Sequence, residues 1–315
     1  MKTEIVGVKT AKDQLIYGAL FTPEKKSTVA IILKHGAGGT FTGSPVLPFA
    51  ELLCKRGYTT LSVNTRNSGS GYAYSLFEWI EEDLNSWIKF LNEKGFDNIV
   101  LHGHSLGTGD VPYYVGKTKN SFVKAVVVSG AHMDFAGAIS IDKFKAIDPT
   151  RPPDVPASYL GEAQKLFDEF ASKCKRLKTQ GQGMRMVEFP FHGPFTALRR
   201  EDPNEAPNWS IPQGWQSVCA NMWLSYFGPD SVNRPIKWYS EFPKNVPVLT
   251  IVHGVVNTAA CPYFSKEIVK AGRSAGLRFD YIEIKEAPHS FAGYEDEAVN
   301  AFAKWLEEIG LPPNK

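Results

Sequence analysis

Short apolar segments that alternate with helix-like segments are the feature of this 315-residue chain that most limits its fold. Residues 28–33 form the run Thr-Val-Ala-Ile-Ile-Leu, which has no polar side chain after the threonine. A strand that is apolar on both sides has to be covered on both faces, which is typical of a parallel sheet. Residues 123–129 and 246–252 have a similar character. These segments predict the central strands of one buried sheet.

Helical spacing of apolar residues separates these strands. Between residues 76 and 92 the apolar side chains recur every three or four positions, and Gly57 and Gly95 follow two such segments as natural helix ends. Strands that alternate with helices require right-handed crossovers and a mainly parallel sheet covered on both sides. The sequence therefore predicts a doubly wound α/β fold. We expect strands at 5–8, 15–21, 28–33, 58–63, 98–101, 123–129, 246–252 and 279–284, and helices at 45–56, 76–92, 107–114, 261–271 and 295–309.

The alternation stops between about residues 135 and 240. Several prolines interrupt this stretch, and a helical pattern follows at 157–177. We interpret 135–240 as an inserted helical lid, and 1–134 with 241–315 as the core domain. The aromatic residues of the insertion are expected both to form its own small core and to wall a substrate pocket. The insertion contains Trp209, Trp215, Trp223 and Trp238, and the candidates for the pocket wall are Phe191, Phe195, Trp215 and Trp223.

Composition excludes several classes of function. The net charge of +2 gives no basic face for nucleic acid, and no apolar run approaches the roughly 20 residues of a membrane helix. The N-terminus lacks the apolar core of a signal peptide. The four cysteines are far apart and lack metal-ligand spacing, so we expect reduced thiols, a cytoplasmic location and no metal. The sequence leaves the formation of a homodimer as an open possibility.

The segment Gly103-His104-Ser105-Leu106-Gly107 carries the candidate nucleophile. Gly-x-Ser-x-Gly alone is a weak pattern, but here a strand precedes it and a helix can follow, as a nucleophile elbow requires. The sharp turn holds the serine in strained backbone angles, and side chains in place of the flanking glycines would collide with neighbouring elements. The helix that starts beneath the serine favours developing negative charge.

A serine hydroxyl needs a base to remove its proton, and His289 is the best candidate. It follows the last predicted strand and precedes the final helix, which places it at the carboxyl edge of the sheet, where the sites of open α/β folds gather. His102 and His104 belong to the strand that leads to Ser105, and His253 ends another strand. The sequence therefore favours His289 as the general base.

An acyl-transfer site also needs hydrogen-bond donors for the oxyanion. The backbone N–H of Leu106, directly after the nucleophile, is one expected donor. The second should come from His35-Gly36-Ala37-Gly38-Gly39, where small residues let the backbone approach a ligand; Ala37 is the first choice and Gly38 the alternative. A dinucleotide-binding loop is a weak rival, because Phe41 stands where its third glycine would be.

These motifs, together with His253-Gly254 and Pro288-His289-Ser290-Phe291, resemble the α/β-hydrolase superfamily, near its lidded esterases, lipases and dienelactone-hydrolase-like members. The resemblance covers about 1–134 and 241–315, and the lid carries no family motif. It implies an ester, thioester, lactone or related acyl substrate, no cofactor, and a covalent acyl-serine intermediate.

One position departs from that pattern. Such enzymes usually carry an aspartate three residues after the His-Gly pair, whereas this chain has Asn257 there. A neutral amide can orient the imidazole of His289 but supplies no charge. Asn257 is the first choice as third member of the site; a carboxylate such as Asp134, or less well Glu286, is the second; and a catalytically impaired site is the third.

The sequence thus predicts a serine hydrolase that cleaves a small carboxylic ester, lactone or thioester with an apolar or aromatic portion. Ser105 would attack, His289 would transfer the proton, Ala37 and Leu106 would hold the oxyanion, and Asn257 would orient His289. Two alternatives remain. One is a non-hydrolytic enzyme of the same fold, such as a lyase, cyclase or acyl transferase, and the other is a ligand-binding protein without turnover.

Overall fold

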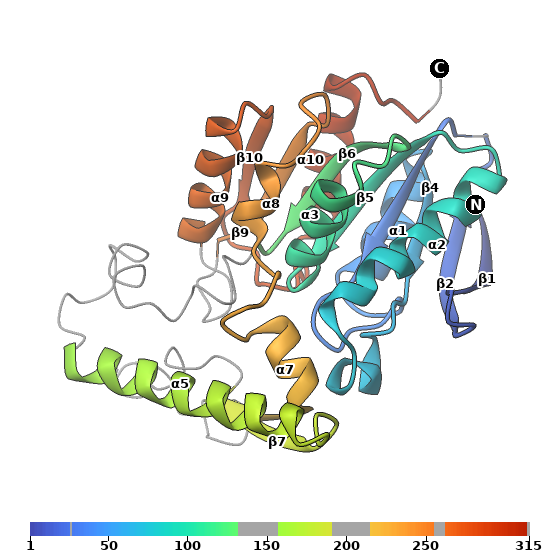
Figure 1. Cartoon of the computed structure of the whole chain (residues 1–315). Coiled ribbons are helices and arrows are strands. Elements are labelled where there is room, and N and C mark those ends of the chain that lie inside the picture. The colour runs from blue at the N-terminus through green and yellow to red at the C-terminus, as the bar shows by residue number, and fades with distance from the viewer. Residues whose placement is uncertain (26, 132–156, 191–214, 255–261, 314–315) are drawn as a thin grey trace.

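A single eight-stranded sheet forms the centre of the molecule in the computed structural model, which describes residues 1–25, 27–131, 157–190, 215–254 and 262–313 (Figure 1). The strand order is β1-β2-β4-β3-β5-β6-β9-β10. β1 and β2 are antiparallel to their neighbours, and every pair from β4 to β10 is parallel. The predicted mainly parallel, doubly wound sheet is confirmed. The strands are β1 (Lys2–Lys9), β2 (Leu15–Thr22), β3 (Val29–Lys34), β4 (Thr59–Val63), β5 (Asn98–His104), β6 (Val123–Ser129), β9 (Val248–His253) and β10 (Phe279–Ile284).

Helices cover both faces of the sheet and divide the core into two parts. Side chains of α1 (Val46–Lys55) and α10 (Glu295–Glu308) pack on one face. The other face carries side chains of α2 (Ile80–Glu93), α3 (Gly107–Thr118), α8 (Pro235–Tyr239) and α9 (Pro262–Ser274). Because successive strand residues point to opposite faces, the all-buried strand β3 supplies both cores.

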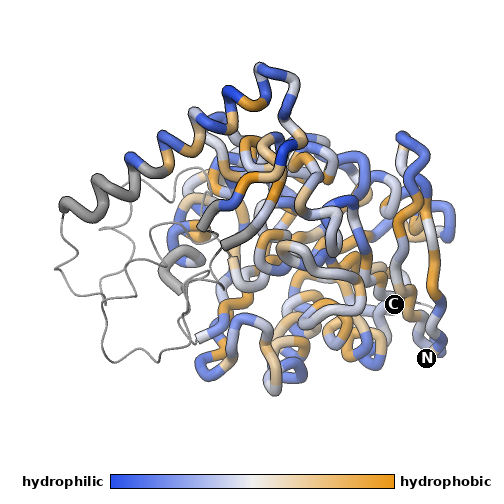
Figure 2. The backbone as a smooth tube through the Cα atoms, turned by 90° about the horizontal axis from the view of Figure 1, so that it is seen from below, coloured by the Kyte–Doolittle hydropathy of each residue, from blue (hydrophilic) through white to orange (hydrophobic). Residues whose placement is uncertain are grey.

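Helix α2 illustrates how the apolar spacing produces this packing. Its buried side chains are Ile80, Leu84, Trp87, Ile88 and Leu91, one stripe along the helix. Complete burial of a large apolar side chain contributes about 1.5–3 kcal/mol, so this stripe holds the helix firmly on the sheet. Figure 2 shows the same separation across the molecule, with hydrophobic segments inside and hydrophilic segments at the margins. Two short 3₁₀ turns, η1 (Gly69–Ala73) and η2 (Phe77–Trp79), precede α2.

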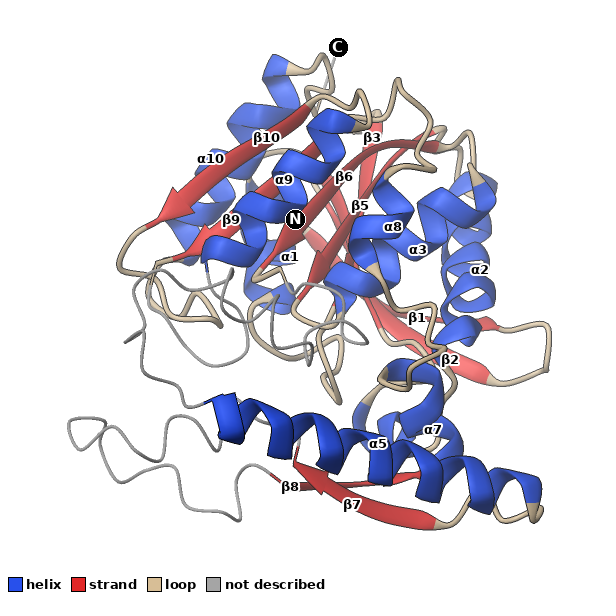
Figure 3. Ribbon diagram, turned by 60° about the vertical axis from the view of Figure 1, so that its left-hand side comes forward, coloured by secondary structure: helices blue, strands red, loops and turns tan. Residues whose placement is uncertain are grey.

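The stretch between β6 and β9 contains α5 (Ala157–Thr179), β7 (Met186–Pro190), β8 (Trp215–Cys219) and α7 (Ala220–Tyr226). These elements lie beyond the carboxyl ends of the parallel strands (Figure 3). β7 and β8 form a two-stranded antiparallel sheet, so the insertion is not wholly helical. The reason is a local period of two, in which Val187 and Val218 are buried while Glu188 and Ser217 are exposed.

The aromatic residues of this region divide between two environments. Trp223 is buried against Phe167 and Phe170 of α5, with ring centroids 5.4 and 4.9 Å away, and it belongs to the core on this face of the main sheet rather than to a separate core of the insertion. Trp238 of α8 packs edge-on against Tyr113 of α3. Phe191, Phe195, Trp209 and the side chain of Trp215 lie outside the described residues, and the pocket expected from them stays a prediction, as do the domain limits.

Two general properties follow from the described part of the chain. Cys54, Cys174 and Cys219 are buried free thiols. No helix there is long and apolar enough to cross a membrane.

Candidate active site

Ser105 lies on the tight turn between β5 and α3 and has a left-handed backbone, with φ of +54°. A non-glycine residue rarely adopts this conformation, which costs roughly 1–3 kcal/mol and persists only where the surrounding structure imposes it. Here the backbone is held at both ends. Ser105 N–H donates to Ser129 O at 2.9 Å, and Ser105 O accepts from the backbone N–H and the hydroxyl of Thr108 at 2.9 and 2.6 Å.

The two flanking glycines are required by close backbone approaches. A Cβ on Gly103 would lie 2.2 Å from Gly107 O. One on Gly107 would lie 3.0 Å from His35 O and 3.1 Å from Lys34 O, at the end of β3. The strand, the turn and the first turn of α3 are therefore packed so closely that side chains at these positions do not fit. This arrangement is the one expected of Gly-x-Ser-x-Gly between a strand and a helix.

The loop after β3 lies directly against Ser105. A Cβ on Gly36 would be 2.7 Å from Ser105 Cβ and 3.1 Å from Ser105 Oγ. Within the described residues, neither the N–H of Ala37 nor that of Leu106 donates to a protein acceptor. Leu106 directly follows Ser105, and Ala37 belongs to the loop whose Gly36 contacts Ser105, so both N–H groups are candidate donors to an anionic oxygen formed there.

His35 fixes the shape of this loop. Its Nδ1 lies 2.7 Å from Gly36 O, which can only accept, so Nδ1 carries the proton and donates. Its Nε2 then accepts from the hydroxyl of Ser68 at 2.5 Å. Burial, and next the nearby positive charge of Lys34, hold the pKa of His35 well below its ordinary value. The ring is therefore neutral and structural, and its hydrogen bonds to Gly36 O and the Ser68 hydroxyl hold the loop in place.

A buried ion pair ties the same loop to the helix after Ser105. Lys34 Nζ lies 2.6 Å from Asp110 Oδ2 and donates to His35 O at 2.8 Å, and both charged side chains are 0% exposed. Burial lowers the pKa of Lys34 and raises the pKa of Asp110, while their mutual attraction opposes both shifts. Removal of either partner would leave an uncompensated charge in the interior, so the pair locks β3 to α3.

His289 reaches this region from the loop between β10 and α10. It is half-buried and lies against Gly130, where a Cβ would be 2.7 Å from its Cε1 and 2.9 Å from its Nδ1. Gly130 follows Ser129, whose carbonyl accepts the hydrogen bond from Ser105 N–H. The serine backbone and the His289 ring therefore meet the same two-residue segment at the end of β6. Gly130 itself has a φ of +61°, a conformation that suits glycine.

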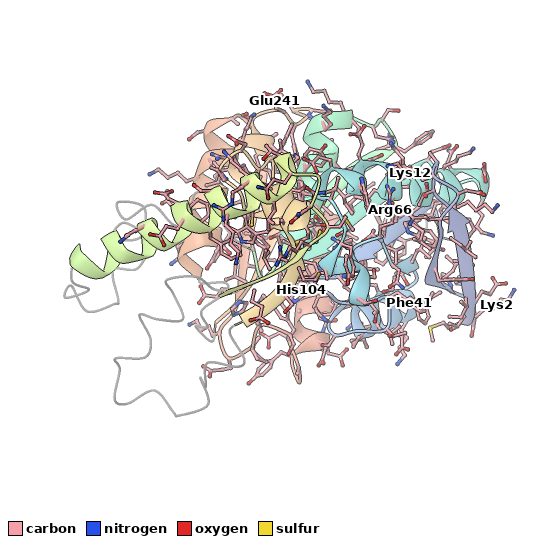
Figure 4. All side chains as sticks on the ribbon, turned by 60° about the horizontal axis from the view of Figure 1, so that its bottom comes forward. Lys2, Lys12, Phe41, Arg66, His104 and Glu241 are labelled. Carbon is pink, nitrogen blue, oxygen red and sulfur yellow. The ribbon has the colours of Figure 1, made fainter. Side chains whose placement is uncertain are left out.

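Two further histidines surround the His289 ring. The His104 ring lies at a centroid distance of 4.8 Å and a tilt of 38°, and Figure 4, which brings this side of the molecule forward, labels it. The His253 ring lies at 5.0 Å, nearly perpendicular, with its Nε2 3.2 Å from His289 Nδ1. Among the described residues, no three His, Cys, Asp or Glu side chains are grouped so as to hold a metal ion.

Ser129 connects the cluster to a deeper histidine. Its hydroxyl lies 2.9 Å from His102 Nε2 and 3.0 Å from His104 Nδ1. One hydroxyl has one proton, so it donates to one ring and accepts from the other. Burial lowers the pKa of His102 to about 3, which keeps that ring neutral. His102 is therefore a buried structural histidine, in agreement with its rejection as the base.

Of the predicted site residues, Ser105, Leu106, Ala37 and His289 come from three separate loops and converge on the carboxyl edge of the sheet. Asn257 and Asp134 lie outside the described residues. Glu286 is exposed. Sequence reasoning missed Gly130, the ion pair of Lys34 with Asp110, and the contact of His253 with His289. A signal existed for the first two, since Gly130 directly follows a buried strand and Lys34 ends one.

Comparisons with known proteins agree with this architecture. A family model described as the α/β hydrolase fold matches residues 29–213, more than half of the chain. No curated protein matches the chain.

Among solved structures, a thermostable carboxyl esterase from Bacillus coagulans is 12% identical with a TM-score of 0.68, covering 98% of this chain and 99% of its own. The siderophore hydrolase EstB from Aspergillus fumigatus is 14% identical with a TM-score of 0.61, covering 98% of both chains. A monoacylglycerol lipase from Paleococcus ferrophilus is 18% identical with a TM-score of 0.58, covering 94% of this chain and 99% of its own. At these identities the likeness concerns the fold.

Proposed function

Because the chain belongs to the α/β-hydrolase fold family, we propose that it is a serine hydrolase that cleaves a carboxylic ester, lactone or thioester with an apolar or aromatic portion. One observation is the main support for the proposal. Ser105 is held with a φ of +54° on a strand-to-helix turn against the loop that carries Ala37, and within the described residues the N–H groups of Ala37 and Leu106 donate to no protein acceptor. Backbone strain of this kind persists where the surrounding structure imposes it, and it clusters at active sites.

The proposed reaction has two halves. Ser105 Oγ attacks the carbonyl carbon of the substrate while its proton passes to His289 Nε2, and the N–H groups of Ala37 and Leu106 bind the resulting oxyanion. The tetrahedral intermediate then collapses to an acyl-serine, and the leaving alcohol or thiol takes the proton from His289. In the second half His289 removes a proton from water, which attacks the acyl carbon and releases the acid and free Ser105.

The loop anchors make this geometry rigid before substrate arrives. His35 fixes the loop that carries Ala37, and the Lys34–Asp110 pair joins that loop to α3. Donors that are already in place need no reorganisation as charge develops, and one such donor contributes about 2.7–4 kcal/mol to lowering a barrier of this type. The apolar or aromatic character of the substrate stays a prediction from the insertion.

A fluorophosphonate probe tests the activity without knowledge of the natural substrate. It should label the protein at Ser105 and abolish hydrolysis of a p-nitrophenyl ester, since an activated serine attacks the phosphorus centre far faster than an ordinary hydroxyl does. Ser105→Ala is the matched control, and it should fold normally, take no label and hydrolyse no ester. A wild-type protein that hydrolyses the ester while Ser105 takes no label would contradict the proposal. A protein that takes no label and turns over no ester would point to binding without this chemistry.

A further inference from the structure

His289 has a hydrogen-bond partner that the sequence did not suggest. Its Nδ1 lies 3.2 Å from Nε2 of His253, the last residue of β9, and the two rings are nearly perpendicular. This distance is that of an N–H donor and a ring-nitrogen acceptor. The contact engages Nδ1, so Nε2 is the ring nitrogen through which His289 would take the proton of Ser105.

Backbone pairing holds the two rings at this separation. His253 is opposite Ile284 in the β9–β10 ladder, and the next N–H, that of Gly254, donates to Ile284 O at 2.9 Å. A Cβ on Gly254 would lie 1.7 Å from Lys285 O, so the segments after β9 and β10 approach so closely that only glycine fits at position 254. The ends of β9 and β10 are thereby joined just before the loop that carries His289. The contact of the two histidines is a consequence of the sheet register.

We propose that His253 is the positioning residue of the site and accepts the hydrogen bond from His289 Nδ1–H, a role that rests on the proposed function of Ser105 and His289. The positions of the ring protons determine which of the two histidines donates this hydrogen bond. A base that removes the proton of Ser105 must offer an unprotonated Nε2, so in the resting site the proton of His289 is on Nδ1. His253 then accepts through Nε2 and carries its own proton on Nδ1.

This arrangement replaces the acidic residue with a neutral imidazole. When His289 gains the proton of Ser105, its Nδ1–H becomes part of an imidazolium, and the hydrogen bond to His253 becomes charge-assisted and stronger. The bond therefore strengthens as the transition state is approached, which is what lowers a barrier. A neutral acceptor stabilises the imidazolium less than a carboxylate would, but it fixes the same tautomer and the same ring orientation.

A purely structural role is the competing interpretation. His253 is buried, with 1% exposure, and its ring also packs against Phe291 at 6.3 Å. If packing were its only purpose, any side chain of similar size would serve, and stability alone would change upon replacement. The two interpretations therefore differ in whether an acceptor atom at the Nε2 position matters for the rate.

The chain offers a matched pair of variants. In His253→Gln the side-chain amide oxygen can reach the position of the imidazole Nε2, and in His253→Asn the amide ends near the position of Nδ1 and cannot reach His289. Both replacements are neutral amides. We expect kcat for a p-nitrophenyl ester to fall by about 10- to 100-fold in His253→Asn with little change in KM, and to be largely recovered in His253→Gln. Equal kcat losses in both variants, or none in either, would overturn the proposal.

The wild-type protein gives a second test that does not depend on how the variants fold. With ¹⁵N-labelled histidine, the Nδ1 proton of His289 should appear as a strongly downfield signal, and scalar coupling across the hydrogen bond should connect it to His253 Nε2. A His289 Nδ1 proton without that coupling would overturn the proposal.

Failure of this proposal and failure of the proposed function are distinguishable. If fluorophosphonate does not label Ser105 of the wild type, the hydrolase function fails. If fluorophosphonate labels the wild type and His253→Asn at the same rate, the hydrolase function is supported and the proposed role of His253 is wrong. Asn257→Ala is the comparison arm, because a kcat loss there with an unaffected His253→Asn would assign the acceptor to Asn257 instead.

Discussion

Replacement of Gly130 by alanine should separate catalysis from stability more clearly than any change to the reacting groups. Gly130 has a φ of +61°, and an L side chain in this conformation costs roughly 1–2 kcal/mol. Its new Cβ would also lie 2.7 Å from His289 Cε1 and 2.9 Å from His289 Nδ1. Carbon atoms pack at about 3.5 Å or more, so His289 Cε1 has to move by roughly 0.8 Å.

A displacement of this size predicts the effect on the rate. A misplacement of about 1 Å in a catalytic group can reduce the rate by about 100-fold, so Gly130→Ala should lower kcat/KM for a p-nitrophenyl ester by about 10- to 100-fold. Urea unfolding should show a loss of about 1–2 kcal/mol from backbone strain. Circular dichroism would check that the variant remains folded at the assay temperature.

Gly276→Ala is the control for backbone strain. Gly276 also has a positive φ, +81°, in the turn between α9 and β10, and a Cβ there meets nothing within 4 Å. This variant should lose similar stability and keep the wild-type rate. If Gly130→Ala is destabilised as much as Gly276→Ala but hydrolyses the ester as fast as the wild type, then His289 is not the base, or its position against Gly130 has no bearing on the reaction.

Two further predictions concern the buried charges and histidines. Lys34→Met should destabilise the protein by about 3–5 kcal/mol in urea unfolding, because it leaves the Asp110 carboxylate buried and unpaired. The double variant Lys34→Met/Asp110→Leu should recover most of this loss, and a double variant as unstable as the single one would show that the pair is not the cause. Burial holds the pKa of His102 at about 3, below the ordinary value of 6.5, so below pH 6.5 the unfolded chain binds a proton that the native state does not. The free energy of unfolding should therefore fall by about 1.4 kcal/mol per pH unit between pH 6.5 and 3 from this group, or about 3 kcal/mol at pH 4.5. His102→Gln should lose that part of the acid sensitivity, and an unchanged pH dependence would mean that His102 is protonated in the native state.

The fold was predictable because the local patterns agree with the tertiary packing. The apolar segment of residues 29–33 and the helical stripe of residues 76–92 each require burial, and each is buried as expected. The elbow was predictable for a different reason, since Gly103 and Gly107 record a steric requirement that acts within a few residues. The two-stranded sheet in the insertion was missed because β7 and β8 are short and their paired residues are 25 to 33 positions apart in the sequence.

The missed features of the site depend on contacts between distant segments. His253 and His289 are 36 residues apart, and their contact follows from the register of β9 on β10, which sequence periodicity does not determine. The same holds for Lys34 and Asp110, although a lone lysine at the end of an apolar strand was a sign that a buried partner is required. A neutral residue at position 257 drew attention to the third member of the site without indicating His253.

The covalent intermediate is the most direct test of the central claim that Ser105 is an activated nucleophile. The protein would be mixed with a p-nitrophenyl ester and quenched with acid during turnover, and the mass of the intact chain and of the peptide that contains Ser105 would be measured. The account predicts a mass increase equal to the acyl group on that peptide, absent from Ser105→Ala. Turnover of the ester with the acyl group on another residue, or with no acyl-enzyme even when the quench precedes one turnover, would contradict it.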